Sequence, residues 1–279
     1  MIEGSGGTLV FPRAIAQLRE PHRTTDSGMN PLDLHVIAFL NQFAHRSWTL
    51  DYFVLLMSKN YVLKTGLITA LLGWLWVRRE DPAAPHRPIL VFGLIASCVG
   101  VLLNRMLSVI APFRERPLRS PDLGFVLPHG VNPHALMSWS AFPSDNATLF
   151  FGLAACIYVV SRRAGIVAFC HVALVVAFAR VYLGFHHPTD ILAGALLGVG
   201  LVSLVTIPAV KTAVTRLPMH WLQRHSPSFH AALFVLVFLI AVTFEPLYDL
   251  AGFGLVTTKT TVSYVAALFQ KMSVAAVDR

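Results

Sequence analysis

Long apolar stretches dominate this chain and limit what it can fold into. Several are about 20 residues long, the length that an α-helix needs to cross the hydrocarbon core of a bilayer. Only 13% of the residues are charged, about half of the roughly 25% that is typical of soluble domains. We therefore expect an all-α fold, a polytopic membrane bundle of about six transmembrane helices. These helices are predicted at residues 61–77, 88–107, 147–160, 164–183, 189–208 and 230–250.

The chain before the first apolar stretch has a different character. Residues 31–57 are interrupted by His45, Arg46 and Asp51, a pattern that favours N-terminal helices lying in the membrane interface. Residues 1–29 lack the apolar core of a signal peptide and are interpreted as a flexible tail. We therefore expect a tail over 1–29, a membrane core over 30–208, and a C-terminal extension over 209–279 that carries the sixth transmembrane helix.

Charge is distributed unevenly between the predicted loops. With six spans, the loops 78–87, 161–163 and 209–229 share one face and are rich in Arg and Lys. The positive-inside rule favours that face as cytoplasmic, although the N-terminal region is also basic. The loops 108–146 and 184–188 then lie on the other face. In so apolar a chain, the net charge of +8 favours anionic lipid head groups or a phosphate site over nucleic acid.

Two polar clusters fall on the second face. "PFRERPL" at 112–118 carries Arg114 and Arg116 between two prolines, and guanidinium groups match phosphate oxygens bidentately. "FPSDN" at 142–146 precedes the third apolar stretch, where Ser144 is a candidate N-cap. The N-terminus of a helix suits an anion. Each cluster also has a plainer interpretation, a solvated basic loop for the first and an ordinary helix cap for the second.

A third cluster lies at the turn between the fourth and fifth spans. "ARVYLGFHHPTD" places Arg180 near the end of one helix and Pro188 as the first residue of the next. His186 precedes that helix, and Asp190 lies four residues later in its first turn. We expect Asp190 to accept a hydrogen bond from one imidazole nitrogen, which would leave the other nitrogen as a nucleophile or base. A polar anchor at the membrane interface is the plainer interpretation.

Together these clusters resemble the type 2 phosphatidic acid phosphatase superfamily of membrane lipid phosphatases, which is related to vanadium haloperoxidases. The third motif of that family, Ser-Arg-x5-His-x3-Asp, is present at 179–190 with Ala179 in place of Ser. The second, Pro-Ser-Gly-His, is "PSDN" here, and Arg-Pro of the first is Arg116-Pro117. The resemblance covers roughly residues 35–208. With the charges of the loops, we expect a protein of the bacterial inner membrane with its active site on the extracytoplasmic side.

The resemblance implies a role for each matching residue. His186 would be the nucleophile that forms a phosphohistidine, and Asp190 would orient it. The phosphoryl oxygens would be held by Arg114, Arg116, Arg180, Ser144, Asp145 and backbone N–H groups near 144–146. No metal or other cofactor is implied, because Arg side chains and a helix N-terminus supply the positive charge.

Two positions depart from the family pattern. The Lys of the first motif is missing, since position 109 is Val; Arg105 is the residue that we consider as its substitute. Asn146 stands where the family has a His that protonates the leaving group, and an amide cannot be a general acid. A phosphate monoester leaves more easily than an alkoxide, because its second pKa is about 6. Asn146 therefore fits a diphosphate substrate.

The sequence also allows alternative interpretations of Asn146. In one alternative, His187, His129 or His134 replaces the missing general acid. In another, the chain is an inactive form, either natural or engineered. The prediction is an integral-membrane lipid phosphatase that acts on a polyprenyl diphosphate or a phospholipid phosphate, with membrane lipids as its surroundings. The alternatives are a lipid phosphotransferase that uses the same His, and a non-catalytic lipid-phosphate binder or transporter. The sequence does not indicate the oligomeric state.

Overall fold

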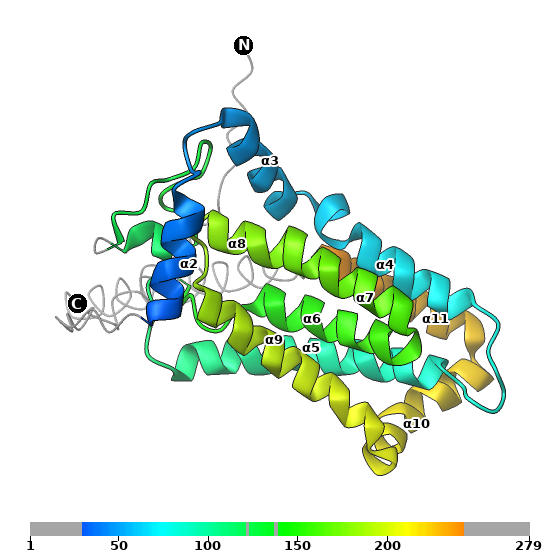
Figure 1. Ribbon diagram of the computed structural model, residues 1–279. Coiled ribbons are helices and arrows are strands. Elements are labelled where there is room, and N and C mark those ends of the chain that lie inside the picture. The colour runs from blue at the N-terminus through cyan, green and yellow to red at the C-terminus, as the bar shows by residue number, and fades with distance from the viewer. Residues whose placement is uncertain (1–29, 121–122, 137–138, 243–279) are drawn as a thin grey trace, which may run out of the picture. The chain divides into compact units, whose positions relative to one another are not determined.

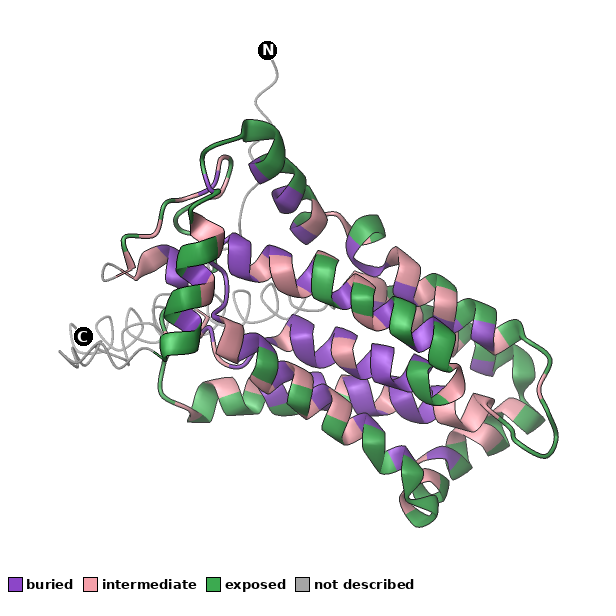
Figure 2. Ribbon diagram, in the orientation of Figure 1, coloured by how far each residue is buried: buried purple, intermediate pink, exposed green. Residues whose placement is uncertain are grey.

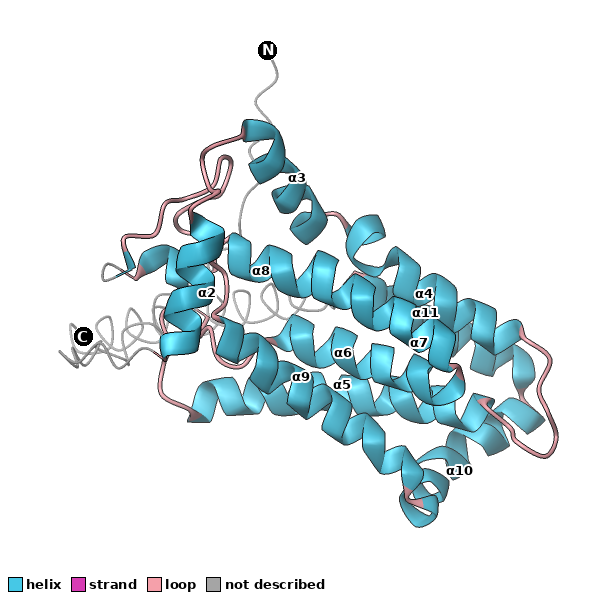
Figure 3. Ribbon diagram, in the orientation of Figure 1, coloured by secondary structure: helices cyan, strands magenta, loops and turns pink. Residues whose placement is uncertain are grey.

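The computed structural model describes residues 30–120, 123–136 and 139–242, and within these ranges the regular structure is helical (Figure 3). The predicted all-α fold is confirmed for this part of the chain. The α-helices are α2 (Pro31–Asn41), α3 (Trp48–Lys59), α4 (Tyr61–Val77), α5 (Arg87–Ile110), α6 (Asp145–Val160), α7 (Arg162–His171), α8 (Phe178–Tyr182), α9 (Pro188–Ser203), α10 (Pro208–Arg224) and α11 (Ser226–Ala241). Shorter turns of helix are η1 (Pro117–Arg119), η3 (Val172–Ala177) and η4 (Leu204–Thr206).

Three of the predicted spans are long and apolar enough to cross a membrane. They are Arg87–Ile110, Arg162–Tyr182 and Pro188–Thr206. The second of these runs through α7, the π-helical turn η3 and α8. The first and third predicted spans are the shorter apolar helices α4 and α6. The sixth overlaps α11, and its last residues lie outside the described ranges. The number of six transmembrane helices stays a prediction.

The predictions for residues 209–229, 31–57 and 1–29 differ in outcome. Residues 209–229, predicted as a loop, instead contain α10 and the beginning of α11. Pro208 occupies the first turn of α10, where its missing N–H costs nothing. The helices expected at 31–57 are present as α2 and α3, but their position at the membrane interface stays a prediction. The predicted tail over 1–29 lies outside the described residues.

Helix α6 is the centre of the unit that spans Thr25–Ala241. It contacts α5, α7, α9 and α4 (Figure 1), and most of its residues are buried (Figure 2). Helix α2 contacts α8 and α9, while α10 packs on α5 and α11 on α4. The N-terminus of α6 therefore lies among neighbouring helices, at the end of the unit that α2 covers.

Glycine lets α9 approach the backbone of α6 closely. A Cβ atom built on Gly198 would lie 2.1 Å from the Thr148 carbonyl oxygen, a distance that real Cβ atoms do not show. Small residues at helix interfaces in membranes permit this kind of backbone contact. The same helix pair aligns the two N-termini, because Ser144 N–H donates to the Asp190 carbonyl oxygen at 3.1 Å.

We expect Gly198→Ala to destabilise the protein by about 1–3 kcal/mol, the usual cost of overpacking a filled interface. Gly200→Ala is the matched control, because its Cβ would have no heavy atom within 4 Å and Ala favours helix over Gly by about 1 kcal/mol. Thermal unfolding in detergent should give a lower midpoint for Gly198→Ala and an unchanged or higher one for Gly200→Ala. Equal shifts would contradict the close packing of α6 and α9.

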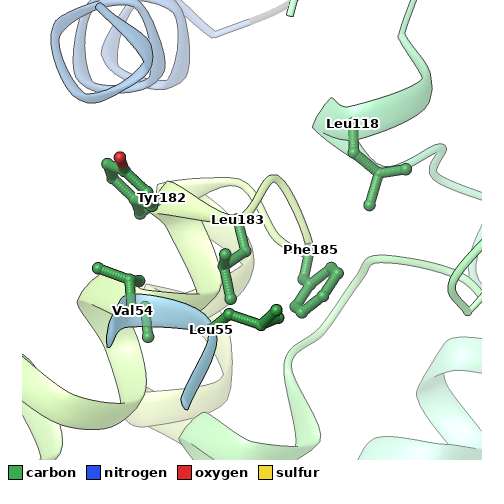
Figure 4. Packing of buried hydrophobic residues seen from close by; sticks show 7 residues of the cluster. Val54, Leu55, Leu118, Tyr182, Leu183 and Phe185 are labelled. Carbon is green, nitrogen blue, oxygen red and sulfur yellow. The ribbon is translucent and has the colours of Figure 1, made fainter. Parts of the chain in front are cut away.

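A hydrophobic cluster supports the turn that follows α8. Figure 4 shows Val54 and Leu55 of α3 beside Tyr182, Leu183 and Phe185, with Leu118 approaching from η1. The turn also contains Gly184 at φ +70°, where an added Cβ would meet Phe125 and Leu118. Burial of these side chains holds the backbone immediately before His186 and leaves little freedom for that residue to move.

Candidate active site

Helix α6 begins as its sequence predicts. Ser144 is the N-cap, since its hydroxyl oxygen accepts from Ala147 N–H at 3.4 Å. Two further backbone donors here are also engaged: Ser144 N–H with the Asp190 carbonyl, and Asn146 N–H with the Asp145 carboxylate at 2.8 Å. The expected anion site on the N–H groups of residues 144–146 is therefore largely occupied by the protein itself.

His186 is buried, and both of its ring nitrogens have defined neighbours. Nδ1 lies 2.8 Å from the Ala141 carbonyl oxygen, which can only accept, so Nδ1 carries the proton. Nε2 lies 3.5 Å from Nη1 of Arg116. The lone pair of the imidazole is thereby directed to the guanidinium, the arrangement that a nucleophile facing an anion-binding group requires.

The prediction that Asp190 accepts a hydrogen bond from His186 is wrong. The Asp190 carboxylate lies 3.9 Å from His186 Nδ1. It accepts instead from His187 N–H at 2.7 Å, lies 3.1 Å from His187 Nδ1, and forms an ion pair with Arg114. The physical reason is local, because Asp190 is the third residue of α9 and closes a capping box on the N-cap His187.

The environment of His186 keeps its ring neutral. Burial is the main cause that lowers the pKa of His186 well below its ordinary value of 6.5, and the positive charges of Arg116 and Arg180 lower it further. The Asp145 carboxylate acts in the opposite direction without reversing the result. At neutral pH, Nε2 is therefore unprotonated and available to attack phosphorus.

Arg116 is the buried cation next to this nucleophile. Its Nη1 donates to the Phe185 carbonyl oxygen and its Nη2 to that of Ser140 at 3.3 Å. Its Nε is buried with no hydrogen-bond partner among the described residues. Burial and the charge of Arg180 lower the pKa of Arg116 to about 10, so the guanidinium stays charged at neutral pH.

Arg180 is the second cation close to His186. Its guanidinium lies over the Phe185 ring at 5.5 Å. Within the described ranges, this side chain has no hydrogen bond or ion pair to the protein. Its N–H donors are therefore available to a phosphoryl group, unlike those of Arg114.

Arg114 is tied to several elements of the fold. Nη1 donates to Thr189 Oγ1 at 2.8 Å and to the Asp190 carboxylate, and Nη2 pairs with the buried Asp33 at 2.7 Å. Although burial opposes it, hydrogen bonds from Thr189 and the Arg114 charge lower the pKa of Asp33. Arg114 thus connects α2, α9 and the loop before η1. Asp33 was not predicted as a site residue; its signal in the sequence is an acidic residue within an apolar helix.

The second motif has its own ion pair. Arg105 Nη2 lies 2.5 Å from the Asp145 carboxylate, and its guanidinium lies over the Trp139 ring at 4.4 Å. Asn146 Nδ2 donates to Asp145 at 3.1 Å, whereas Asn146 Oδ1 is buried with no partner among the described residues. Arg105 therefore does reach the site, where it neutralises Asp145.

The alternative acids occupy different surroundings. His187 Nδ1 faces Asp190. The ring of His129 contacts the carboxylate of the buried Asp51, which also accepts a hydrogen bond from the Tyr182 hydroxyl at 2.5 Å. His134 is exposed. No hydrogen bond joins any of these rings to Asn146 or His186 within the described ranges. A replacement for the missing acid therefore stays a prediction.

Comparisons with known proteins agree with the motifs. Residues 113–214 match the model of the PAP2 superfamily. The bacitracin transport permease protein BcrC of Bacillus licheniformis is 24% identical over 174 residues, 62% of this chain and 78% of that protein. Undecaprenyl-diphosphatase BcrC of Bacillus subtilis is 19% identical over 170 residues, 60% and 79% of the two chains. Lipid A 1-diphosphate synthase of Escherichia coli is 26% identical over 188 residues, 64% and 75% of the two chains.

No solved structure matches the chain. The resemblance drawn from the three motifs is confirmed by the family match over 113–214. Together with the apolar helices, the family and the relatives support a phosphoric ester hydrolase of the membrane.

Proposed function

We propose that this chain, a PAP2 superfamily protein over residues 113–214, removes the terminal phosphate of a polyprenyl diphosphate through a phosphohistidine on His186. The observation that carries the proposal is the state of the His186 ring. Its Nδ1 proton is held by the Ala141 carbonyl oxygen, and its Nε2 faces Arg116 at 3.5 Å. A relative named undecaprenyl-diphosphatase supports the substrate class.

The first step transfers the phosphoryl group to the protein. Nε2 of His186 attacks the terminal phosphorus, and the bond to the bridging oxygen breaks with its electron pair leaving on the polyprenyl phosphate. Arg116 and Arg180 stabilise the charge on the equatorial oxygens. The Ala141 carbonyl oxygen keeps its hydrogen bond to Nδ1–H as the ring becomes positive. Asp190 binds His187 and Arg114 and does not contact the reacting atoms, so it serves as a positioning residue.

The second step returns the free enzyme. Water attacks phosphorus, and the P–N bond breaks with its electron pair returning to Nε2. The proton that water loses goes to the departing phosphate or to solvent, and inorganic phosphate leaves. Asn146 supplies no proton in the first step, and a diphosphate needs none, because the departing phosphate monoester is stable as an anion near pH 7. The substrate is therefore a diphosphate lipid in preference to a lipid monophosphate.

The orientation of the site in the membrane follows from charge. The described loop residues within 111–144, and those at 183–187, lie at one end of the helices. The loop between α4 and α5, with Arg78 and Arg79 and followed by Arg87 at the start of α5, lies at the other end (Figure 3). The positive-inside rule favours the second end as cytoplasmic. We propose a bacterial inner-membrane protein with an extracytoplasmic active site.

The proposal predicts release of inorganic phosphate from a polyprenyl diphosphate by the purified protein in detergent, without added metal. Because protonation of His186 is disfavoured by its lowered pKa, the rate should be maintained as the pH falls through 6.5 and decline only below it. The same lipid with a single phosphate should react more slowly. Absence of phosphate release from either lipid, by both the natural chain and Asn146→His, would contradict the proposal.

A non-catalytic lipid-phosphate binder is the second candidate. The buried amide of Asn146 in place of an acid favours it, whereas the organised nucleophile His186 does not. The same assay separates the two, since a binder takes up the lipid without releasing phosphate. A labelled alcohol or sugar acceptor in the assay distinguishes transfer from hydrolysis, a relevant test because one relative is named lipid A 1-diphosphate synthase.

A further inference from the structure

A buried lysine that belongs to none of the three motifs lies near the candidate site. Lys64 is in the first turn of α4, and only 3% of it is exposed. A buried ammonium is costly unless a partner compensates it. The helix N-terminus makes the cost larger, because the partial charge there is already positive.

The surroundings of Lys64 supply little compensation. Its ammonium lies over the Tyr61 ring at 5.2 Å. No hydrogen bond or ion pair joins Nζ to the part of the chain that the structure describes. The charged groups that act on it are Arg180, which repels it, and Asp145, which attracts it. Asp145 is already paired with Arg105 at 2.5 Å.

The helix that carries Lys64 packs against helices that lead to the phosphate site. Helix α4 contacts α6, which begins at Asp145, and η3, which leads into α8 and Arg180. The Lys64 carbonyl oxygen lies 3.2 Å from Nε2 of His171, which ties this turn of α4 to α7. Both charged neighbours of the ammonium are thus residues of the candidate active site.

We propose that Lys64 binds the substrate's phosphate as the third cation of the site, beside Arg116 and Arg180. An anion of the phosphate or diphosphate class would supply the partner that the protein does not. Position 109, where the resemblance led us to expect Lys, is 67% exposed on α5, so a Lys there would not have the same burial. The inference rests on the proposed function only for the identity of the anion.

The test measures binding of inorganic diphosphate to the purified full chain by isothermal titration calorimetry. Lys64→Met should weaken binding by about 10- to 100-fold, the effect of losing one hydrogen bond to a charged group. Lys64→Arg should bind within a few-fold of the natural chain. Lys59→Met is the matched control, because Lys59 is exposed at the end of α3, and it should not change the affinity.

A purely structural role for Lys64 predicts a different result. Loss of a structural residue would lower the thermal midpoint without anion, whereas removing an uncompensated buried charge should leave that midpoint unchanged or raise it. Should Lys64→Met not purify, Lys64→Gln takes its place and keeps a polar side chain. Binding by the neutral variant as tight as by the natural chain, or no binding of diphosphate by the natural chain, would overturn the assignment.

The outcome also separates this inference from hydrolysis itself. If diphosphate binding depends on Lys64 but the chain releases no phosphate from any lipid, the phosphate-binding role of Lys64 stands and the proposed hydrolysis is rejected. If Lys64→Met turns over the lipid with unchanged diphosphate affinity and KM, the proposed hydrolysis stands and the role of Lys64 is rejected.

Discussion

His186→Ala should remove turnover of a polyprenyl diphosphate, lowering kcat by more than about 10⁴-fold, as loss of a nucleophile does in other covalent enzymes. Among the described residues, His186 provides the imidazole nitrogen that is both unprotonated and directed at Arg116. Alanine leaves Arg116 and Arg180 in place, so lipid binding should change far less than kcat. Phosphate release and lipid binding are measured on the same preparation.

His187→Ala is the matched control for this prediction. His187 is adjacent, equally buried at 3% exposed, and has Nδ1 facing Asp190. With a lipid labelled in its terminal phosphate, rapid acid-free quenching should trap label on the protein for the natural chain and for His187→Ala. His186→Ala should trap none. Substantial turnover by His186→Ala, or label trapped on another residue, would reject the phosphohistidine mechanism.

Asn146→His should accelerate cleavage of a lipid monophosphate by about 10²–10⁴-fold, the usual contribution of a general acid. Asn146 is only 6% exposed, its neighbour Asp145 belongs to the site, and its Oδ1 has no partner within the described ranges. An imidazole there could give a proton to a departing alkoxide. Cleavage of the diphosphate should gain less, because its leaving group needs no proton.

Asn146→Gln is the control that changes size without adding an acid, and it should not accelerate either reaction. Rates are compared at saturating lipid, so that differences in binding do not enter. Equal acceleration of both lipids by Asn146→His would mean that position 146 acts through architecture or anion binding. If neither lipid reacts faster, a neighbouring histidine already donates the proton, and His187→Ala is the next variant to assay.

Several features of this protein follow from the sequence alone, because they depend on neighbours along the chain. The apolar length of 88–107 and 189–208 required helices, and α5 and α9 are there. Ser144 and Pro188 marked the starts of α6 and α9, since caps and first-turn prolines act within a few residues. The three clusters around Arg116, Ser144 and His186 together were enough to suggest a resemblance to the PAP2 superfamily, whose model matches residues 113–214.

The partners of the reactive groups were decided only by the tertiary structure. His186 Nδ1 donates to the Ala141 carbonyl oxygen, 45 positions away, because Asp190 is engaged in the capping box of α9. Arg114 forms an ion pair with Asp33, 81 positions away. Lys64 came close to Arg180 and Asp145 because α4 packs on α6 and η3. Local propensities fix where helices begin and end, but hydrogen bonds between distant residues depend on how the helices pack, which no local pattern specifies.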